Sequence, residues 1–212
     1  MEQKHNLMTH IVSTKRVSSG KYIDLASLTV DDVNILDINR ALNYIYRFTG
    51  HWKDNPPLTV AQHTKLVHRL ATELFPDDLE IELDCVCHDM PEAYTGDIAT
   101  PLKKLFGTQF KDYEGQIEDT VYLKLYDPIV KHKLTKEVYE ARKVCDLLAL
   151  DIERRAIWLD PKGKDHWPDI PMENFTTAKN KRSYYEWAIA DRDVDLVALY
   201  NTVASKIFYG AE

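Results

Sequence analysis

The sequence predicts an all-α fold with a short β-hairpin near the N-terminus. Three observations support this: apolar residues recur at helical spacing through most of residues 31–208, several of these stretches begin with a capping residue, and no alternating apolar–polar run is long enough for a sheet. The 212 residues are 44% hydrophobic, which is enough for one core. We therefore expect one domain over residues 1–212.

The N-terminal extension, residues 1–28, is expected to hold the hairpin. β-Branched residues on both sides of Ser18-Ser19-Gly20 predict two short strands within residues 10–25. The C-terminal part, residues 158–212, is expected to hold a surface excursion over 158–176, which has three prolines and a glycine, and then a last helix.

Caps and breakers indicate the helices between these two ends. The clearest start is Thr59, which forms a capping box with Gln62 after two prolines, and Asp31 with Asp32 is the expected cap of the preceding helix. Thr100-Pro101 and Thr135 are further expected starts. The expected helices are 31–46, 59–75, 77–90, 100–106, 110–121, 135–152 and 191–208.

Composition excludes several classes of function. The net charge is −7 and there is no basic stripe, which argues against a DNA or RNA polymer as ligand. No apolar run approaches the roughly 18 residues of a membrane span, and residues 1–6 lack the pattern of a signal peptide. Cys85, Cys87 and Cys145 form no CxxC pair and lie among apolar residues. We expect a cytoplasmic protein with buried free thiols, because a reducing compartment keeps such thiols unpaired.

Four polar residues occupy positions that a purely structural account does not explain. His63 lies in the first turn of a helix with a core face, His88-Asp89 ends an apolar stretch, and Asp146 is surrounded by apolar residues. A buried carboxylate is normally paired, protonated or bound to metal, because leaving it alone costs several kcal/mol. Two imidazoles and two carboxylates would suit one divalent ion, Mn²⁺, Co²⁺, Fe²⁺ or Zn²⁺.

Each of these residues also has an ordinary explanation. A single histidine in a helix is usually structural, and Arg142, one turn before Asp146, could pair with that carboxylate. Asp151 is a rival fourth ligand, although five residues of helix turn it about 140° away from Asp146.

The order His63, His88-Asp89, Asp146 resembles the metal signature of HD-domain phosphohydrolases. Residues 88–103, HDMPEAYTGDIATPLK, resemble the HDxxExxxGDxxxPxK pattern of the bacterial 5′-deoxynucleotidase branch and its phage relatives, including dATP triphosphohydrolases. Residues 47–52, RFTGHW, and 59–63, TVAQH, resemble upstream segments of the shorter phage members. The resemblance covers about residues 10–155 and implies an HD-domain helical bundle that assembles as a homo-oligomer.

The resemblance also implies roles for the site residues. His63, His88, Asp89 and Asp146 would hold one divalent metal ion, Glu92 would act as the catalytic acid or base, and Asp97 would help to place the attacking water. The ordinary alternatives are a capping carboxylate for Glu92 and a turn aspartate for Asp97. Substrate would be bound by Arg47, His51, Trp52, Lys103 and Lys143.

The expected activity is metal-dependent hydrolysis of the 5′ phosphoester of a 2′-deoxynucleotide. The products would be nucleoside and phosphate from a monophosphate, or nucleoside and triphosphate from a triphosphate such as dATP. Phe48 stands where the monophosphatases tend to carry tryptophan, which leaves both substrates open. The alternatives are hydrolysis of a cyclic dinucleotide or an alarmone, and a helical domain that binds nucleotides without catalysis.

Overall fold

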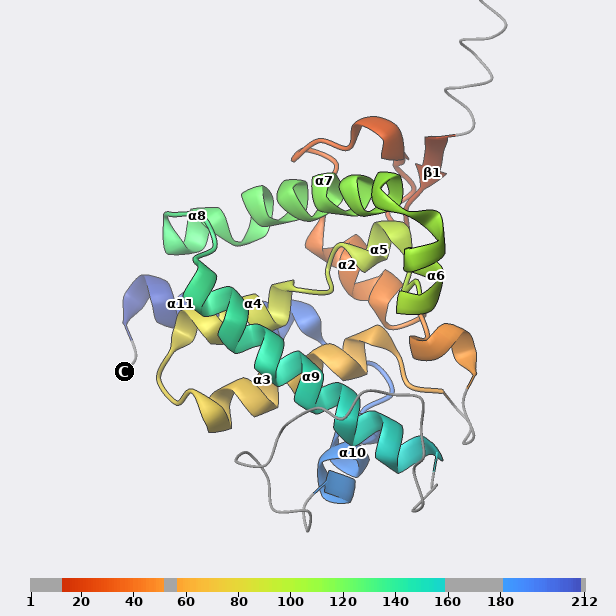
Figure 1. The fold of residues 1–212 in the computed structure, drawn as a ribbon. Coiled ribbons are helices and arrows are strands. Elements are labelled where there is room, and N and C mark those ends of the chain that lie inside the picture. The colour runs from red at the N-terminus through yellow and green to blue at the C-terminus, as the bar shows by residue number, and fades with distance from the viewer. Residues whose placement is uncertain (1–12, 52–56, 159–180, 211–212) are drawn as a thin grey trace, which may run out of the picture.

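The computed structural model describes residues 13–51, 57–158 and 181–210, and it is all-α with a two-stranded N-terminal hairpin, as predicted (Figure 1). The elements in order are β1 (Thr14–Arg16), β2 (Tyr22–Asp24), η1 (Leu25–Ser27), α2 (Ile35–Leu42), η2 (Arg47–Gly50), α3 (Val60–Leu74), α4 (Leu79–Cys87), α5 (Glu92–Thr95), α6 (Thr100–Phe106), α7 (Thr108–Leu125), α8 (Asp127–Val130), α9 (Lys136–Trp158), α10 (Lys181–Ala190) and α11 (Leu196–Tyr209).

The hairpin pairs β1 and β2 antiparallel, with Lys15 opposite Ile23. Gly20 turns the chain with φ +93°, a conformation that side chains beyond glycine rarely adopt. Ile23 is 2% exposed and belongs to the main apolar cluster, so the hairpin is packed onto the helices.

Helices α3, α4 and α9 pack against one another, and α11 packs on α4 (Figure 1). Because α4 is covered by all three, its apolar residues divide between two clusters. Leu83 and Val86 join the cluster with α2, α7 and α11, whereas Ile81 and Cys85 join the cluster with α3 and α9. Because α3, α9 and α11 surround α4, the residues at the C-terminal end of α4 lie inside the molecule.

Some helix boundaries are confirmed and others are wrong. The capping box at Thr59 is present: its hydroxyl accepts from the Gln62 N–H at 3.2 Å, and the Gln62 side chain accepts from the Thr59 N–H at 2.9 Å. The predicted start at Asp31-Asp32 is wrong, because Asn34 is the N-cap and Asp32 instead accepts from Thr29 within the preceding turn.

The C-terminal region also differs from the prediction. The last helix begins at Leu196, capped by Asp195, and the segment before it contains α10, which the sequence analysis did not predict. The predicted excursion lies outside the described residues except for its first residue, which ends α9. All three cysteines are buried and free, as expected. Among the residues that the structure describes, no helix combines the length and apolarity that crossing a membrane requires.

Candidate metal centre

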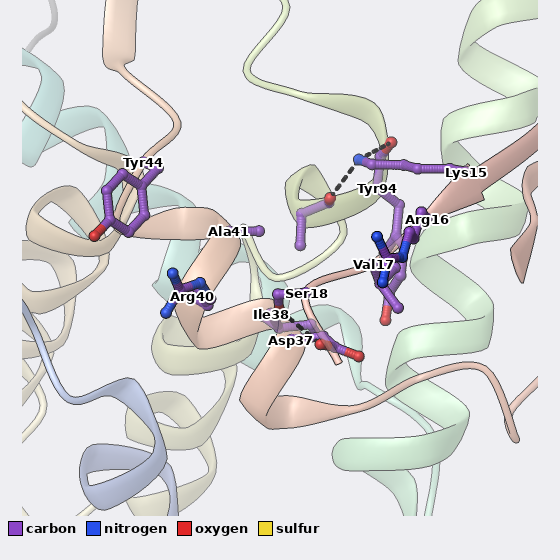
Figure 2. A pocket seen from close by; sticks show the side chains of 11 residues that line it. Lys15, Arg16, Val17, Ser18, Asp37, Ile38, Arg40, Ala41, Tyr44 and Tyr94 are labelled. Atoms are coloured by element: carbon purple, nitrogen blue, oxygen red, sulfur yellow. Dashed lines mark hydrogen bonds between the residues drawn. The ribbon is translucent and has the colours of Figure 1, made fainter. Parts of the chain in front are cut away.

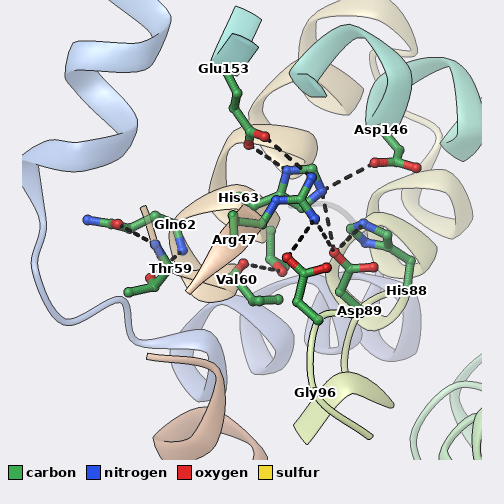
Figure 3. A network of polar contacts seen from close by, with 12 residues as sticks. Arg47, Thr59, Val60, Gln62, His63, His88, Asp89, Gly96, Asp146 and Glu153 are labelled. Carbon is green, nitrogen blue, oxygen red and sulfur yellow. Dashed lines mark hydrogen bonds and ion pairs between the residues drawn. The ribbon is translucent and has the colours of Figure 1, made fainter. Parts of the chain in front are cut away.

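The four predicted metal ligands come together from three helices (Figure 3). His63 lies in the first turn of α3 and is fully buried, His88 is the C-cap of α4, and Asp89 follows it. Asp146 projects from α9 on the more open side, with 28% of its side chain exposed. The packing of α3, α4 and α9 therefore brings together residues that are up to 83 positions apart in the sequence.

The closest group consists of His63, His88 and Asp89, whose ligand atoms all lie within 4.8 Å of one another. Asp89 Oδ2 is 3.2 Å from His88 Nε2 and 3.4 Å from His63 Nε2. Asp146 adjoins this triad, with its Oδ1 3.3 Å from His63 Nε2. Two imidazoles and two carboxylates thus surround one point, and they are a donor set that first-row divalent metals accept.

The second nitrogen of each histidine ring determines what the first can do. His63 Nδ1 lies 2.6 Å from a Glu153 oxygen, and His88 Nδ1 lies 2.8 Å from the Cys85 carbonyl. Because both partners are acceptors, each Nδ1 carries a proton and donates it, which leaves a lone pair on Nε2 of the neutral ring. Both Nε2 atoms and Asp89 Oδ2 are buried, and no described residue forms a hydrogen bond with them. This arrangement fits a bound metal ion.

The carboxylates around His63 favour an additional positive charge at the triad. Burial lowers the pKa of His63, but the neighbouring Glu153 and Asp146 outweigh it and raise that pKa to about 10. Burial raises the pKa of Asp146, but the adjacent His63 outweighs this and brings the pKa to about 2. A proton on His63 or a metal ion at Nε2 supplies the same missing charge, so the two compete for this position.

Two ordinary explanations considered for these carboxylates are settled by the structure. Arg142 donates from Nε to Asp84 at 3.3 Å, so its partner is Asp84 and Asp146 is left to face His63. Asp151, the rival ligand, is 2% exposed and accepts from Arg154 and Arg155 at 2.9 Å. Both arginines lie on the same helix as Asp151 and donate hydrogen bonds to its carboxylate.

Glu92 and Asp97 lie beside the triad, at α5 and just after it. Glu92 Oε2 is buried without a partner. Burial and the nearby charges of Asp89 and Asp97 raise the pKa of Glu92 well above its usual range. Burial also raises the pKa of Asp97. Glu92 therefore holds its proton to a higher pH than an exposed glutamate does, which suits a proton donor.

Arg47 reaches into the same centre from η2. Its guanidinium lies 3.3 Å from Glu153, 3.8 Å from Asp97 and 3.9 Å from Asp89. The turn that carries it holds Phe48 and Thr49 at φ +55° and +56°, which costs on the order of 1–3 kcal/mol per residue. Backbone bonds from Arg47 N–H to Leu58 C=O and from Val60 N–H to Ile45 C=O, both 2.9 Å, fasten this strained turn to the start of α3.

The other predicted substrate contacts are less tightly placed. Lys103 on α6 is paired with Glu114 of α7 at 2.8 Å, Lys143 is exposed on α9, and His51 is exposed at the end of η2. Trp52 lies outside the described residues. Glu153 was missed by the sequence analysis, because it stands next to Arg154 and Arg155 in a stretch that resembles a solvated helix face. Its spacing of seven residues from Asp146 was the available signal.

The N-terminal hairpin contacts α5, the short helix that begins with Glu92. Lys15 Nζ donates to the carbonyls of Ala93 and Tyr94 in α5, at 3.0 and 3.4 Å (Figure 2). These residues line a cavity of about 330 Å³ between β1, α2 and α5. The hairpin thereby holds the short turn that carries Glu92.

Comparison with known proteins identifies relatives. No family model matches the chain. The chain is 29% identical to an uncharacterized protein of Rhodobacter capsulatus over 144 residues, which are 68% of this chain and 72% of that protein. It is 32% identical to the uncharacterized protein YfdR of Escherichia coli K12 over 152 residues, 71% of this chain and 74% of that protein. The chain therefore belongs to the same protein family as YfdR.

Proposed function

We propose that the protein is an HD-type, metal-dependent phosphohydrolase that cleaves the 5′ phosphoester of 2′-deoxynucleotides. The observation that carries this proposal is the convergence of three buried ligand atoms, His63 Nε2, His88 Nε2 and Asp89 Oδ2, that have no hydrogen-bond partner among the described residues and lie beside a carboxyl group with a raised pKa. A purely structural polar cluster would pair these atoms with one another's protons. The sequence resemblance of residues 88–103 supplies the reaction class.

The chain's own residues provide what such a reaction needs. The metal would be held by His63, His88, Asp89 and Asp146, and when bound it would lower the pKa of a water and polarise a phosphoryl oxygen. Glu92, whose pKa is raised by burial, would donate a proton to the departing ribose oxygen. Asp97 would orient the attacking water by accepting its hydrogen bond.

Binding of the phosphate requires cations close to the metal ligands. Arg47 is the best placed, because its guanidinium already faces Asp89 and Asp97. Lys103 would add a second charge from α6, once it leaves Glu114. A deoxynucleoside monophosphate and dATP are both proposed substrates, since each presents the same 5′ phosphoester to these groups.

The test is a product assay with Mn²⁺ and with Co²⁺ on the four dNMPs and the four dNTPs, with chelated protein as control. Chromatography separates nucleoside, phosphate and triphosphate, so the products identify the bond that is cut. We expect nucleoside from one phosphorylation level. No turnover on any of the eight would overturn the proposal and direct the assay to cyclic dinucleotides and alarmones.

A variant separates catalysis from metal binding. Glu92→Ala should retain bound metal and lose about 100-fold or more in kcat, which is the usual contribution of a general acid. Glu137→Ala, at an exposed position on α9, is the matched control and should keep full activity. Full activity in Glu92→Ala would show that the proton comes from elsewhere.

A further inference from the structure

Glu153 occupies a position that a carboxylate rarely takes, fully buried in the C-terminal third of α9. It lies seven residues after Asp146, and seven residues make almost two full turns, so the two carboxylates share a face of α9. Because an unpaired carboxylate would be costly there, its partners explain why it is tolerated.

Its two oxygens contact two different parts of the candidate centre (Figure 3). One oxygen lies 2.6 Å from His63 Nδ1, and the other lies 3.3 Å from Arg47 Nη2. His63 belongs to the metal triad, whereas Arg47 also faces Asp89 and Asp97. The buried carboxylate of Glu153 therefore contacts both His63, a candidate metal ligand, and Arg47, the proposed phosphate-binding cation.

We propose that Glu153 is a positioning residue that sets the ring orientation and tautomer of His63 and, with its other oxygen, aims the guanidinium of Arg47. As an acceptor at Nδ1, it keeps the proton on that nitrogen and the lone pair on Nε2, where a metal binds. The second half of the proposal, concerning Arg47, rests on the proposed function; the first half, concerning His63, rests on metal binding alone.

Replacement by glutamine separates these two contacts without a change of size. Glutamine has one acceptor oxygen, so it can accept from His63 or from Arg47 but not from both. If its NH₂ group faces His63, Nδ1 must become the acceptor and the ring proton moves to Nε2. That nitrogen then has no lone pair with which to bind the metal. If the NH₂ group faces Arg47, two donors meet and the guanidinium is displaced.

The experiment measures Co²⁺ binding by calorimetry and by the visible absorption of the bound ion, for wild type and Glu153→Gln. We expect a 10- to 100-fold weaker affinity in Glu153→Gln, the usual loss when a histidine ligand's supporting partner is removed. Glu140→Gln, at an exposed carboxylate on the same helix, is the matched control and should bind like wild type. Because an amide oxygen turned toward His63 would spare this contact, Glu153→Leu, which removes both acceptors, is measured beside it, and equal affinity in Glu153→Leu and wild type would overturn the His63 half.

A measurement on the wild type keeps the test valid if Glu153→Gln fails to fold. In the Zn²⁺-loaded protein labelled with ¹⁵N-histidine, His63 should carry its proton on Nδ1. A proton on Nε2 would overturn the proposal.

Kinetics test the Arg47 half. Glu153→Gln, assayed at saturating Co²⁺, should raise KM for the nucleotide at least several-fold, and Glu140→Gln should not. Since an amide oxygen turned toward Arg47 would spare this contact, the deciding variant is Glu153→Leu, and an unchanged KM in Glu153→Leu would overturn this half. If wild type binds Co²⁺ but hydrolyses no nucleotide, the proposed function fails while the His63 half is still decided by affinity and tautomer. Absence of Co²⁺ binding in wild type would overturn both.

Discussion

Two buried polar networks lie one helical turn apart on the same pair of helices, and they differ in how completely they are paired. In the first, Asp84 of α4 accepts from the Tyr122 hydroxyl and from Arg142 Nε of α9. In the second, His88 follows Asp84 by four residues and Asp146 follows Arg142 by four residues. The two networks therefore lie on the same pair of helices but differ in how many of their polar atoms are hydrogen-bonded.

The Asp84 network is closed: both carboxylate oxygens have donors, and the charge of Arg142 compensates that of Asp84. The network of His63, His88 and Asp89 is open, because within residues 13–51, 57–158 and 181–210 three of its buried ligand atoms have no hydrogen-bond partner. Burial of charged residues is thus common to both and identifies neither as functional. The distinguishing signal is a set of buried ligand atoms that converge without hydrogen-bond partners among the described residues.

The strongest test of this difference removes one half of the closed pair. Asp84→Ala leaves Arg142 buried and uncompensated, so we expect a loss of about 3–5 kcal/mol in the free energy of unfolding, measured by urea denaturation. Asp84→Leu combined with Arg142→Met removes both charges and should lose markedly less. Asp112→Ala, at an exposed position on α7, is the control. A double variant as unstable as the single one would show that the pair is more than a compensated charge.

In the open network the largest expected effect is on metal affinity. His88→Ala removes a ligand, so Co²⁺ affinity should fall by about 100-fold or more, beyond the loss expected for a supporting partner. His132→Asn, at an exposed histidine that pairs with Glu80, should bind Co²⁺ like wild type. Calorimetry measures both, and undiminished binding in His88→Ala would move the site elsewhere.

Metal should also stabilise the fold, since it binds only the folded arrangement. At a Co²⁺ concentration of 100 times Kd, the free energy of unfolding should rise by about 2.7 kcal/mol. For a chain of this length that corresponds to a rise in Tm of roughly 5–11 °C. Thermal denaturation with Co²⁺ and with chelator measures the shift. His88→Ala should lose it, whereas a shift that persists there would indicate binding outside the triad.

The smallest expected effect is a pH-dependent gain in stability on replacing Glu92. Its pKa is raised in the folded protein, chiefly by burial, so the unfolded chain loses this proton first as pH rises. Ionisation of Glu92 therefore costs stability above about pH 4.5 and nothing well below it. Urea denaturation in chelator should show Glu92→Gln more stable than wild type at pH 8 and equal to it at pH 3.5. A gain of the same size at both pH values would assign it to packing instead.

The fold and the triad were predictable because they depend on local signals. The capping box at Thr59 and the apolar spacing of α3 and α4 determine where His63 and His88 lie along their helices. The start of α2 was not predictable from acidic residues alone, since Asp32 satisfies an earlier turn and Asn34 takes the cap. α10 was missed because its first turn is polar and its apolar stripe is short.

The partners of the buried charges could not be read from the chain. Arg142 had Asp146 within one turn but pairs with Asp84, 58 residues away, because α4 lies against α9 there. Glu153 likewise has neighbouring arginines in sequence but contacts His63 and Arg47 across the core. Such pairings depend on which helix faces meet, and that is a property of the packed molecule.

The exposure of helix α6 affects the dynamics expected of the candidate centre. None of its side chains is buried, and Leu105 is 82% exposed, whereas most of α3 is buried. Helices with few buried contacts open locally at low free-energy cost, so backbone amides of α6 should exchange with deuterium far sooner than those of α3. Lys103, which α6 carries, would then change position more often than His63, which lies on the buried α3.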